Sequence, residues 1–246
     1  LRVAATFAAD LLTQNDADED HVPTVEPISV GREGPAPLLI RLPSLSAETA
    51  WIAGHLRRAH RAGTPWSDMA VFYREYDPAG KSLMQSLRGK GVPVVWQKDV
   101  KFAAEQDSVK VMSMHSSKGL EFPLVVLAGL GMIDVKDIDK AREEARLLYV
   151  AMTRSTHELV MTYDRETEIT KRLATAAGSL TPEDLDGLYQ YAGQEIDEGR
   201  AVAALWADAD RQAGGEGERR RELYLAARVN KLRLIAEEQL RKEGQA

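Results

Sequence analysis

The sequence has no cysteine among its 246 residues and no long apolar run. Without cysteine the chain cannot form a disulfide framework or a thiolate metal site, which fits a reducing cytoplasm. No stretch approaches the roughly 18 apolar residues that span a bilayer, and the first residues lack the basic start and cleavage signal of a leader peptide. We therefore expect a cytoplasmic protein that makes no contact with a membrane.

An excess of positive charge is missing as well. The chain has 38 Asp and Glu against 32 Lys and Arg, a net charge of −6. Such a molecule does not bind nucleic acid by bulk electrostatics, so any contact with DNA must be local. Hydrophobic residues make up 44% of the chain, which is enough to bury a core in one large or two small domains.

Short apolar strands alternate with helical patterns through much of the chain, after an acidic, proline-rich connection at 15–37. This alternation predicts an α/β fold with a mainly parallel sheet and helices on both faces. We expect strands at 38–42, 69–74, 92–96, 110–114, from 124 onward and at 158–163, and helices at 1–14, 46–63, 82–91 and 143–154.

The most informative stretch is 110–131, KVMSMHSSKGLEFPLVVLAGLG, in which a polar loop joins two strands. The loop at 115–119 brings together two serines, a lysine and a glycine, and these supply hydroxyls, one cation and open backbone N–H groups to an anion such as phosphate. Glu121 adds a carboxylate that can accept from a ribose hydroxyl. An ordinary polar connection between strands is the alternative interpretation, because these residues are common in loops. Working loops in parallel sheets lie at the carboxyl ends of the strands, where we expect 115–119.

Three segments carry a resemblance to a known family. The string HSSKGLEF at 115–122 closely resembles motif V of the UvrD/Rep/PcrA group of superfamily 1 DNA helicases. EEARLLYVAMTR at 143–154 resembles motif VI of the same group, and MAVFYRE at 69–75 resembles motif IVa. The resemblance implies a RecA-like fold of the P-loop NTPase type, with residues 1–165 as the second motor domain, called 2A, and 166–246 as a helical C-terminal extension. Only QKDVKFAAEQDS separates Trp96 from Val109, so the 2B insertion of many relatives is absent or was removed.

The resemblance also implies roles for single residues. Arg154 becomes the catalytic arginine finger that meets the γ-phosphate of ATP, Glu121 the contact to the nucleotide sugar, and Gly119 part of the nucleotide cleft. Arginine can instead complement a helix carboxyl end at that position. The implied contacts to single-stranded DNA are Arg74, His115, Ser116, Ser117 and Lys118. The alternatives are that Arg74 closes a strand with its head in water and that His115 is structural.

The hydrolytic half of such a motor is not in this sequence. The chain has no GxxxxGK[ST] phosphate loop and no strand that ends in the acidic pair holding Mg²⁺. It starts at Leu1 with helical periodicity already under way, which predicts a fragment of a longer protein. We expect this chain alone to be a monomer that does not hydrolyse ATP. The parent would use ATP and Mg²⁺, with the Mg²⁺ ligands on a missing N-terminal RecA-like lobe, and would move 3′ to 5′ on single-stranded DNA during DNA repair or replication restart.

Two other functions stay open at this point. The chain can be a non-enzymatic module that binds nucleic acid or protein and keeps the RecA-like fold without a working motor. The motor can also belong to a larger helicase-nuclease.

In the tail we expect helix from Thr181 to Ala213, a break at 214–218, and a last amphipathic helix that packs on the first domain rather than on a partner.

Overall fold

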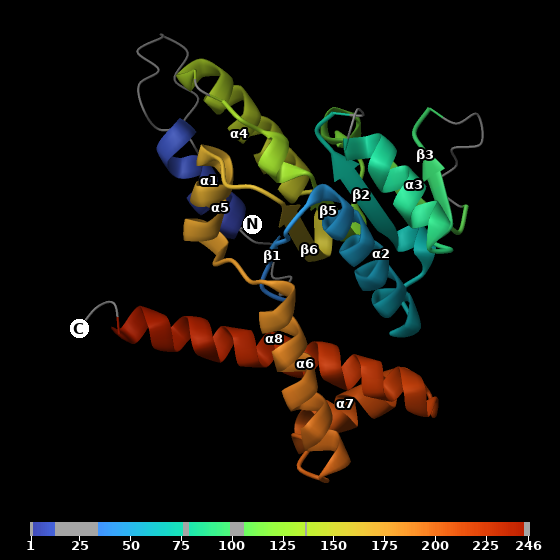
Figure 1. Cartoon of the computed structure of the whole chain (residues 1–246). Coiled ribbons are helices and arrows are strands. Elements are labelled where there is room, and N and C mark those ends of the chain that lie inside the picture. The colour runs from blue at the N-terminus through green and yellow to red at the C-terminus, as the bar shows by residue number, and fades with distance from the viewer. Residues whose placement is uncertain (1, 13–33, 76–78, 99–105, 136, 244–246) are drawn as a thin grey trace. The chain divides into compact units, whose positions relative to one another are not determined.

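Six parallel strands form one sheet in the computed structural model, which describes residues 2–12, 34–75, 79–98, 106–135 and 137–243 (Figure 1). Every pair of neighbouring strands is parallel, so the expected α/β class is confirmed. In spatial order the strands are β1 (Leu38–Arg41), β6 (Ser155–Tyr163), β5 (Phe122–Ala128), β2 (Met69–Tyr73), β4 (Val109–Ser113) and β3 (Val94–Trp96).

Helices cover both faces of this sheet, as Figure 1 shows. Alternate strand residues such as Phe72, Met112 and Leu127 join one core with helices α1 (Arg2–Leu12), α4 (Ile138–Met152) and α5 (Glu168–Ala177). The intervening residues, such as Val71 and Val126, are equally buried on the face that carries α2 (Leu45–Arg61) and α3 (Lys81–Gly89). Burial on both faces explains why the strands read as continuous apolar runs.

The connection from β4 to β5 is short for two parallel strands, which usually need a dozen or more residues between them. It consists of the 3₁₀ turn η3 (Met114–Ser117) and residues 118–121. Because β2 lies between β4 and β5, this segment runs from the carboxyl edge of the sheet to the amino edge, on the face covered by α4. The expectation that the whole loop lies at the carboxyl ends of the strands is therefore wrong: its second half reaches the opposite edge.

The chain divides into two units, one of residues 1–54 and 65–179 and the other of 55–64 and 180–246. The first holds the sheet together with α5, whose Ile169 and Leu173 belong to the sheet core. The second contains helices α6 (Pro182–Asp197), α7 (Ala203–Ala213) and α8 (Gly217–Glu243). A single helix to Ala213 was expected, but α6 ends before Gly199, which takes a φ of +69° that interrupts a helix. Among the described residues no helix is both long and apolar enough to cross a bilayer.

A buried polar network lies inside the helical unit. Arg228 donates two hydrogen bonds to the carboxylate of Glu195, at 2.8 and 2.7 Å, and the Tyr224 hydroxyl donates a third at 3.1 Å. The Arg228 hydrogen bonds lower the pKa of Glu195, burial opposes this shift, and Tyr224 adds to it. The network joins α6 to α8 through a fully satisfied ion pair.

Candidate nucleotide and nucleic-acid site

Arg154 lies at the amino edge of the sheet, between the end of α4 and the start of β6. Its backbone carbonyl accepts from Phe122 N at 2.9 Å, which fixes it beside the first residue of β5. Its side chain donates from Nε at 3.1 Å to the carbonyl of Val150 in the last helical turn, which also accepts from the Thr153 hydroxyl at 2.8 Å. The alternative role of this arginine, completing a helix carboxyl end, is thus present in the structure.

The remaining donors of Arg154 meet only neutral acceptors. Nη1 lies 3.5 Å from the carbonyl of Leu120, and Nη2 lies 3.3 Å from the hydroxyl of Thr153. Among the described residues no carboxylate pairs with this guanidinium. A guanidinium has five N–H donors, so at least two are free to bind an added anion while the other bonds hold the group in place.

The expected nucleotide residues of the loop lie next to Arg154 along the chain. Glu121 directly precedes Phe122, and its side chain is exposed. Gly119 takes a φ of +85°, and nothing lies within 4 Å of where a Cβ would stand. Glycine is therefore selected here by backbone conformation, because a positive φ strains other residues. The structure brings Arg154, Gly119 and Glu121 to one edge of the sheet.

The DNA candidates of the loop begin at the opposite edge. Ser113 caps η3 by accepting from Ser116 N at 3.3 Å, and the two serine hydroxyls are 2.9 Å apart. His115, Ser116 and Lys118 are exposed, and the side chains of His115 and Lys118 have no partner among the described residues. Ser117 differs from the expectation: it is buried, and its hydroxyl donates to the carbonyl of Met114 at 2.7 Å. In this conformation Ser117 stabilises the turn and cannot reach a phosphate.

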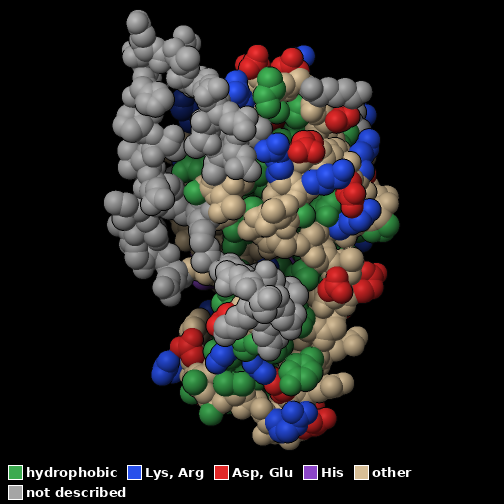
Figure 2. Space-filling model, turned by 90° about the vertical axis from the view of Figure 1, so that its left-hand side faces the viewer, with side chains coloured by type: hydrophobic (Ala, Val, Ile, Leu, Met, Phe, Trp, Pro, Cys, Tyr) green, Lys and Arg blue, Asp and Glu red, His purple; other side chains and the backbone are tan. Residues whose placement is uncertain are grey.

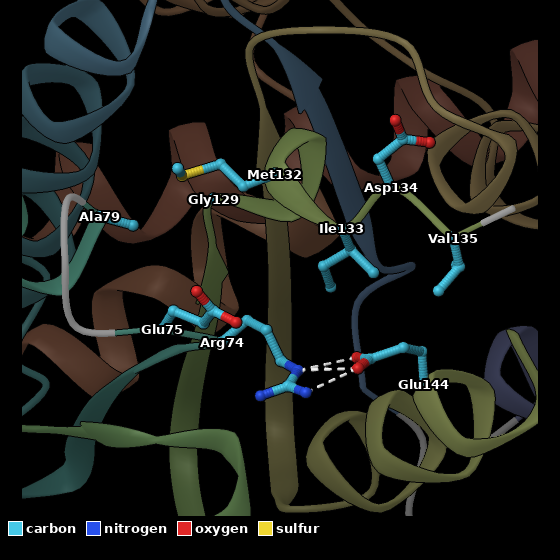
Figure 3. A pocket seen from close by; sticks show the side chains of 9 residues that line it. All are labelled: Arg74, Glu75, Ala79, Gly129, Met132, Ile133, Asp134, Val135 and Glu144. Atoms are coloured by element: carbon cyan, nitrogen blue, oxygen red, sulfur yellow. Dashed lines mark hydrogen bonds and ion pairs between the residues drawn. The ribbon is translucent and has the colours of Figure 1, made fainter. Parts of the chain in front are cut away.

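Arg74 also differs from the expectation that it meets a DNA phosphate. It follows β2 and donates from Nε and Nη2 to both oxygens of Glu144 on α4, at 2.7 to 2.9 Å, as the dashed lines in Figure 3 show. The hydrogen bonds to Glu144 raise the pKa of Arg74 further above its ordinary value. Its charge is thus neutralised within the domain, and contact with DNA stays a prediction that requires this ion pair to open.

The Arg74–Glu144 ion pair forms one wall of a cavity of 190 Å³ at the carboxyl edge of the sheet (Figure 3). Glu75 and Asp134 also line this cavity, so its carboxylates outnumber its single arginine. Phosphate is disfavoured by such an excess of negative charge. On the face drawn in Figure 2, Lys/Arg and Asp/Glu side chains are interspersed over the described residues, as the negative net charge predicts.

Sequence reasoning missed Glu48, a fully buried acid on α2. Its Oε1 accepts from Gly129 N and from the hydroxyl of Thr162, both at 2.6 Å. The available signal was its spacing: Glu48 precedes the buried Ile52 by four residues and so lies on the apolar stripe of the helix. It was overlooked because an acid in the first turn of a helix is also favourable in water.

Known proteins resemble the part of the chain that carries this site. The family described as UvrD-like helicase C-terminal domain matches residues 97–166. Residues 97–166 thus resemble the UvrD-like helicase C-terminal domain in sequence. The match includes the η3 loop, α4 and Arg154, so the resemblance to the UvrD, Rep and PcrA group is confirmed.

Curated UvrD-like relatives agree over the same short region. ATP-dependent DNA helicase Rep of Buchnera aphidicola is 44% identical over 64 residues, which are 24% of this chain and 10% of that protein. DNA helicase II of Escherichia coli is 42% identical over 64 residues, 24% of this chain and 9% of the relative. ATP-dependent DNA helicase PcrA of Staphylococcus aureus is 37% identical over 73 residues, 26% of this chain and 10% of the relative. The matched segments span about a tenth of these relatives.

A solved structure shares the fold over a longer range. The C-terminal domain of a possible DNA helicase from Lactobacillus plantarum superposes with a TM-score of 0.52 at 19% identity. The similarity covers 73% of this chain and 95% of that domain. At this identity the likeness supports the RecA-like fold alone, and it agrees with the parallel sheet described above.

Proposed function

We propose that this chain is the second motor lobe of an ATP-dependent UvrD-like DNA helicase. The observation that carries the proposal is the position of Arg154: a guanidinium held by main-chain carbonyls, without a carboxylate partner among the described residues, beside the loop that contains Gly119 and Glu121. An arginine that only stabilises a helix end does not have to lie beside the loop that contains Gly119 and Glu121.

In the proposed complex a first RecA-like lobe holds the ATP triphosphate and Mg²⁺. ATP supplies the phosphoryl group, and this chain supplies Arg154 to the developing charge on its γ-phosphate. Glu121 accepts a hydrogen bond from the ribose. The Val150 and Leu120 carbonyls hold the guanidinium in place, so little reorganisation is needed when the lobes close.

Single-stranded DNA is proposed to contact the other end of the same short segment, at His115 and Ser116, and Lys118 further along it. The η3 connection crosses the sheet in residues 114–121, so it links the DNA end directly to the nucleotide end. Closure of the lobes on ATP then moves both ends together, and by family resemblance the stepping direction is 3′ to 5′. Arg74 joins this DNA path only if its ion pair with Glu144 opens.

ATP hydrolysis in the presence of single-stranded DNA tests the proposal. The complete protein that carries this chain is expected to hydrolyse ATP faster when DNA is added and to unwind a duplex, whereas the isolated chain binds neither Mg²⁺ nor the triphosphate well enough to turn over. Hydrolysis by the isolated chain at the rate of a full motor contradicts the proposal. Absence of hydrolysis in the complete protein favours a binding module that keeps the fold without a motor.

A further inference from the structure

Glu48 and Asp164 each have a buried carboxylate oxygen without a hydrogen-bond partner in the first unit. Oε2 of Glu48 has none, although Oε1 of the same carboxyl accepts two bonds. Oδ1 of Asp164 has none either, although Nε of Arg165 lies 3.5 Å away. Burying an unpaired carboxylate oxygen is costly, and two such atoms in one region call for a common explanation.

Both acids lie against the same structural junction. Glu48 reaches from α2 to Gly129, just after β5, and to Thr162 on β6. Asp164 follows β6 and packs against the turn after β5, because a Cβ placed on Gly131 would stand 2.8 Å from Asp164 Oδ1. The carboxyl ends of β5 and β6 are therefore held between the two side chains.

We propose that Glu48 and Asp164 share one proton, and that this proton fastens the carboxyl ends of β5 and β6 to helix α2. Glu48 carries the proton on Oε2 and donates it to Oδ1 of the Asp164 carboxylate. One hydrogen bond then satisfies both orphaned oxygens, while Oε1 keeps its bonds to Gly129 and Thr162. Nε of Arg165 lies 3.5 Å from the same Oδ1.

The surroundings of Glu48 favour its protonated form more than water does. Burial raises the pKa of Glu48, the bonds from Thr162 and Gly129 oppose this shift, and the charge of Asp164 adds to it. Among the described residues, the charge that acts on Glu48 is that of Asp164, and Arg165 lies beside Asp164. Since the folded pKa is above the unfolded one, the stability from this proton is complete below the unfolded pKa and is lost as pH rises through the folded pKa. The proton is shared whether or not the lobe binds ATP.

NMR of the side-chain carboxyl carbons across a pH series tests the shared proton on the folded 246-residue chain. The Glu48 signal, assigned by its disappearance in Glu48→Gln, should report a protonated carboxyl at neutral pH, when exposed glutamates are ionised. In Asp164→Asn the charged acceptor is gone, so the Glu48 titration should shift to lower pH. A Glu48 signal that titrates with the exposed glutamates overturns the proposal, as does an Asp164→Asn variant that leaves it unmoved.

Glu48→Gln also serves as the conservative variant. Its amide oxygen can accept from Gly129 and Thr162, and its NH₂ can donate to Asp164 without titrating. We expect this variant to match the wild-type melting temperature at neutral pH, to exceed it as the pH rises, and to retain slow exchange of the Gly129 amide. Glu48→Ala should melt at a lower temperature than wild type and should lose the slow exchange of the Gly129 amide. If Glu48→Gln destabilises the chain as much as Glu48→Ala does at every pH, the working form of Glu48 is charged and the proposal fails.

Discussion

Arg154 and Arg74 lie at opposite edges of one sheet and use their guanidinium groups in opposite ways. Arg74 gives three hydrogen bonds to a single carboxylate, Glu144, and its charge is satisfied inside the domain. Arg154 gives its bonds to two carbonyls and a hydroxyl, so it is held in place but not neutralised. The difference separates an arginine that stabilises the fold from one whose charge is available to a ligand.

This contrast extends to the helical unit. Arg228 pairs with Glu195 as Arg74 pairs with Glu144, and the run of arginines at 219–221 is also largely paired, since Arg220 and Arg221 bind Asp210 and Asp197. Arg74 of motif IVa has an acidic partner, whereas Arg154 of motif VI has none among the described residues. Removing paired arginines should therefore cost stability, and removing Arg154 should cost activity.

The largest effect on stability is expected from Arg228→Ala. It leaves the Glu195 carboxylate buried with only Tyr224 as a side-chain donor, and breaking such a pair costs about 3 kcal/mol. Thermal unfolding of the isolated chain measures this loss. Arg211→Ala is the matched control: its ion pair with Asp208 is exposed, and its loss should change stability by less than about 0.5 kcal/mol. Equal losses in the two variants would show that the buried Arg228–Glu195 pair stabilises the chain no more than the exposed pair.

Arg74→Ala should destabilise the chain by a smaller amount, about 2 kcal/mol. The reason is that Glu144 is 14% exposed and can regain water, whereas Glu195 is 5% exposed. Urea unfolding of Arg74→Ala, Glu144→Gln and the double variant separates the pair energy from other effects. If the two single losses simply add, the pair contributes nothing, and Arg74 is available to DNA after all.

These pairs were only partly predictable from the sequence. The motif strings at 115–122 and 143–154 identified Arg154, Glu121 and the loop, because they occur as continuous text. The partner of Arg74 lies 70 residues away, so only the folded chain brings it near. The passage of 114–121 across the sheet was equally hidden, since it depends on β2 lying between β4 and β5. The periodicity of apolar residues predicted which segments are strands and which are helices, but it did not predict the break between α6 and α7.

The pH dependence of stability should distinguish Glu195, whose pKa is lowered by Arg228, from Glu48, whose pKa is raised by burial. Arg228 lowers the folded pKa of Glu195, so its contribution is present above the unfolded pKa and is lost as pH falls through the folded pKa. Melting temperatures over an acid series should therefore fall less steeply for Glu195→Gln than for wild type. Glu48→Gln should instead change the melting temperature at the high-pH end of the series, because the pKa of Glu48 is raised. If both variants changed the melting temperature in the same pH range, the directions given for both pKa values would be contradicted.

The smallest expected effect concerns Lys118, another cation without a partner among the described residues. In the complete protein, Lys118→Ala should reduce the slope of the logarithm of DNA affinity against the logarithm of salt by about 0.7, the loss of one phosphate contact to a single strand. Lys171→Ala, an exposed lysine on α5, is the control and should leave the slope unchanged. A slope unchanged in Lys118→Ala would move the DNA path away from this loop.

The proposed role of Arg154 at the γ-phosphate of ATP is tested most directly by steady-state ATP turnover of the complete protein with Arg154→Ala. We expect kcat with saturating DNA to fall by about 10³- to 10⁵-fold while ATP binding is retained. The melting temperature of the chain should change little, because a helix-end contact contributes less than about 1 kcal/mol. Arg172→Ala, another arginine of the first unit, should leave turnover unchanged. Unchanged turnover in Arg154→Ala would show that this arginine only completes its helix.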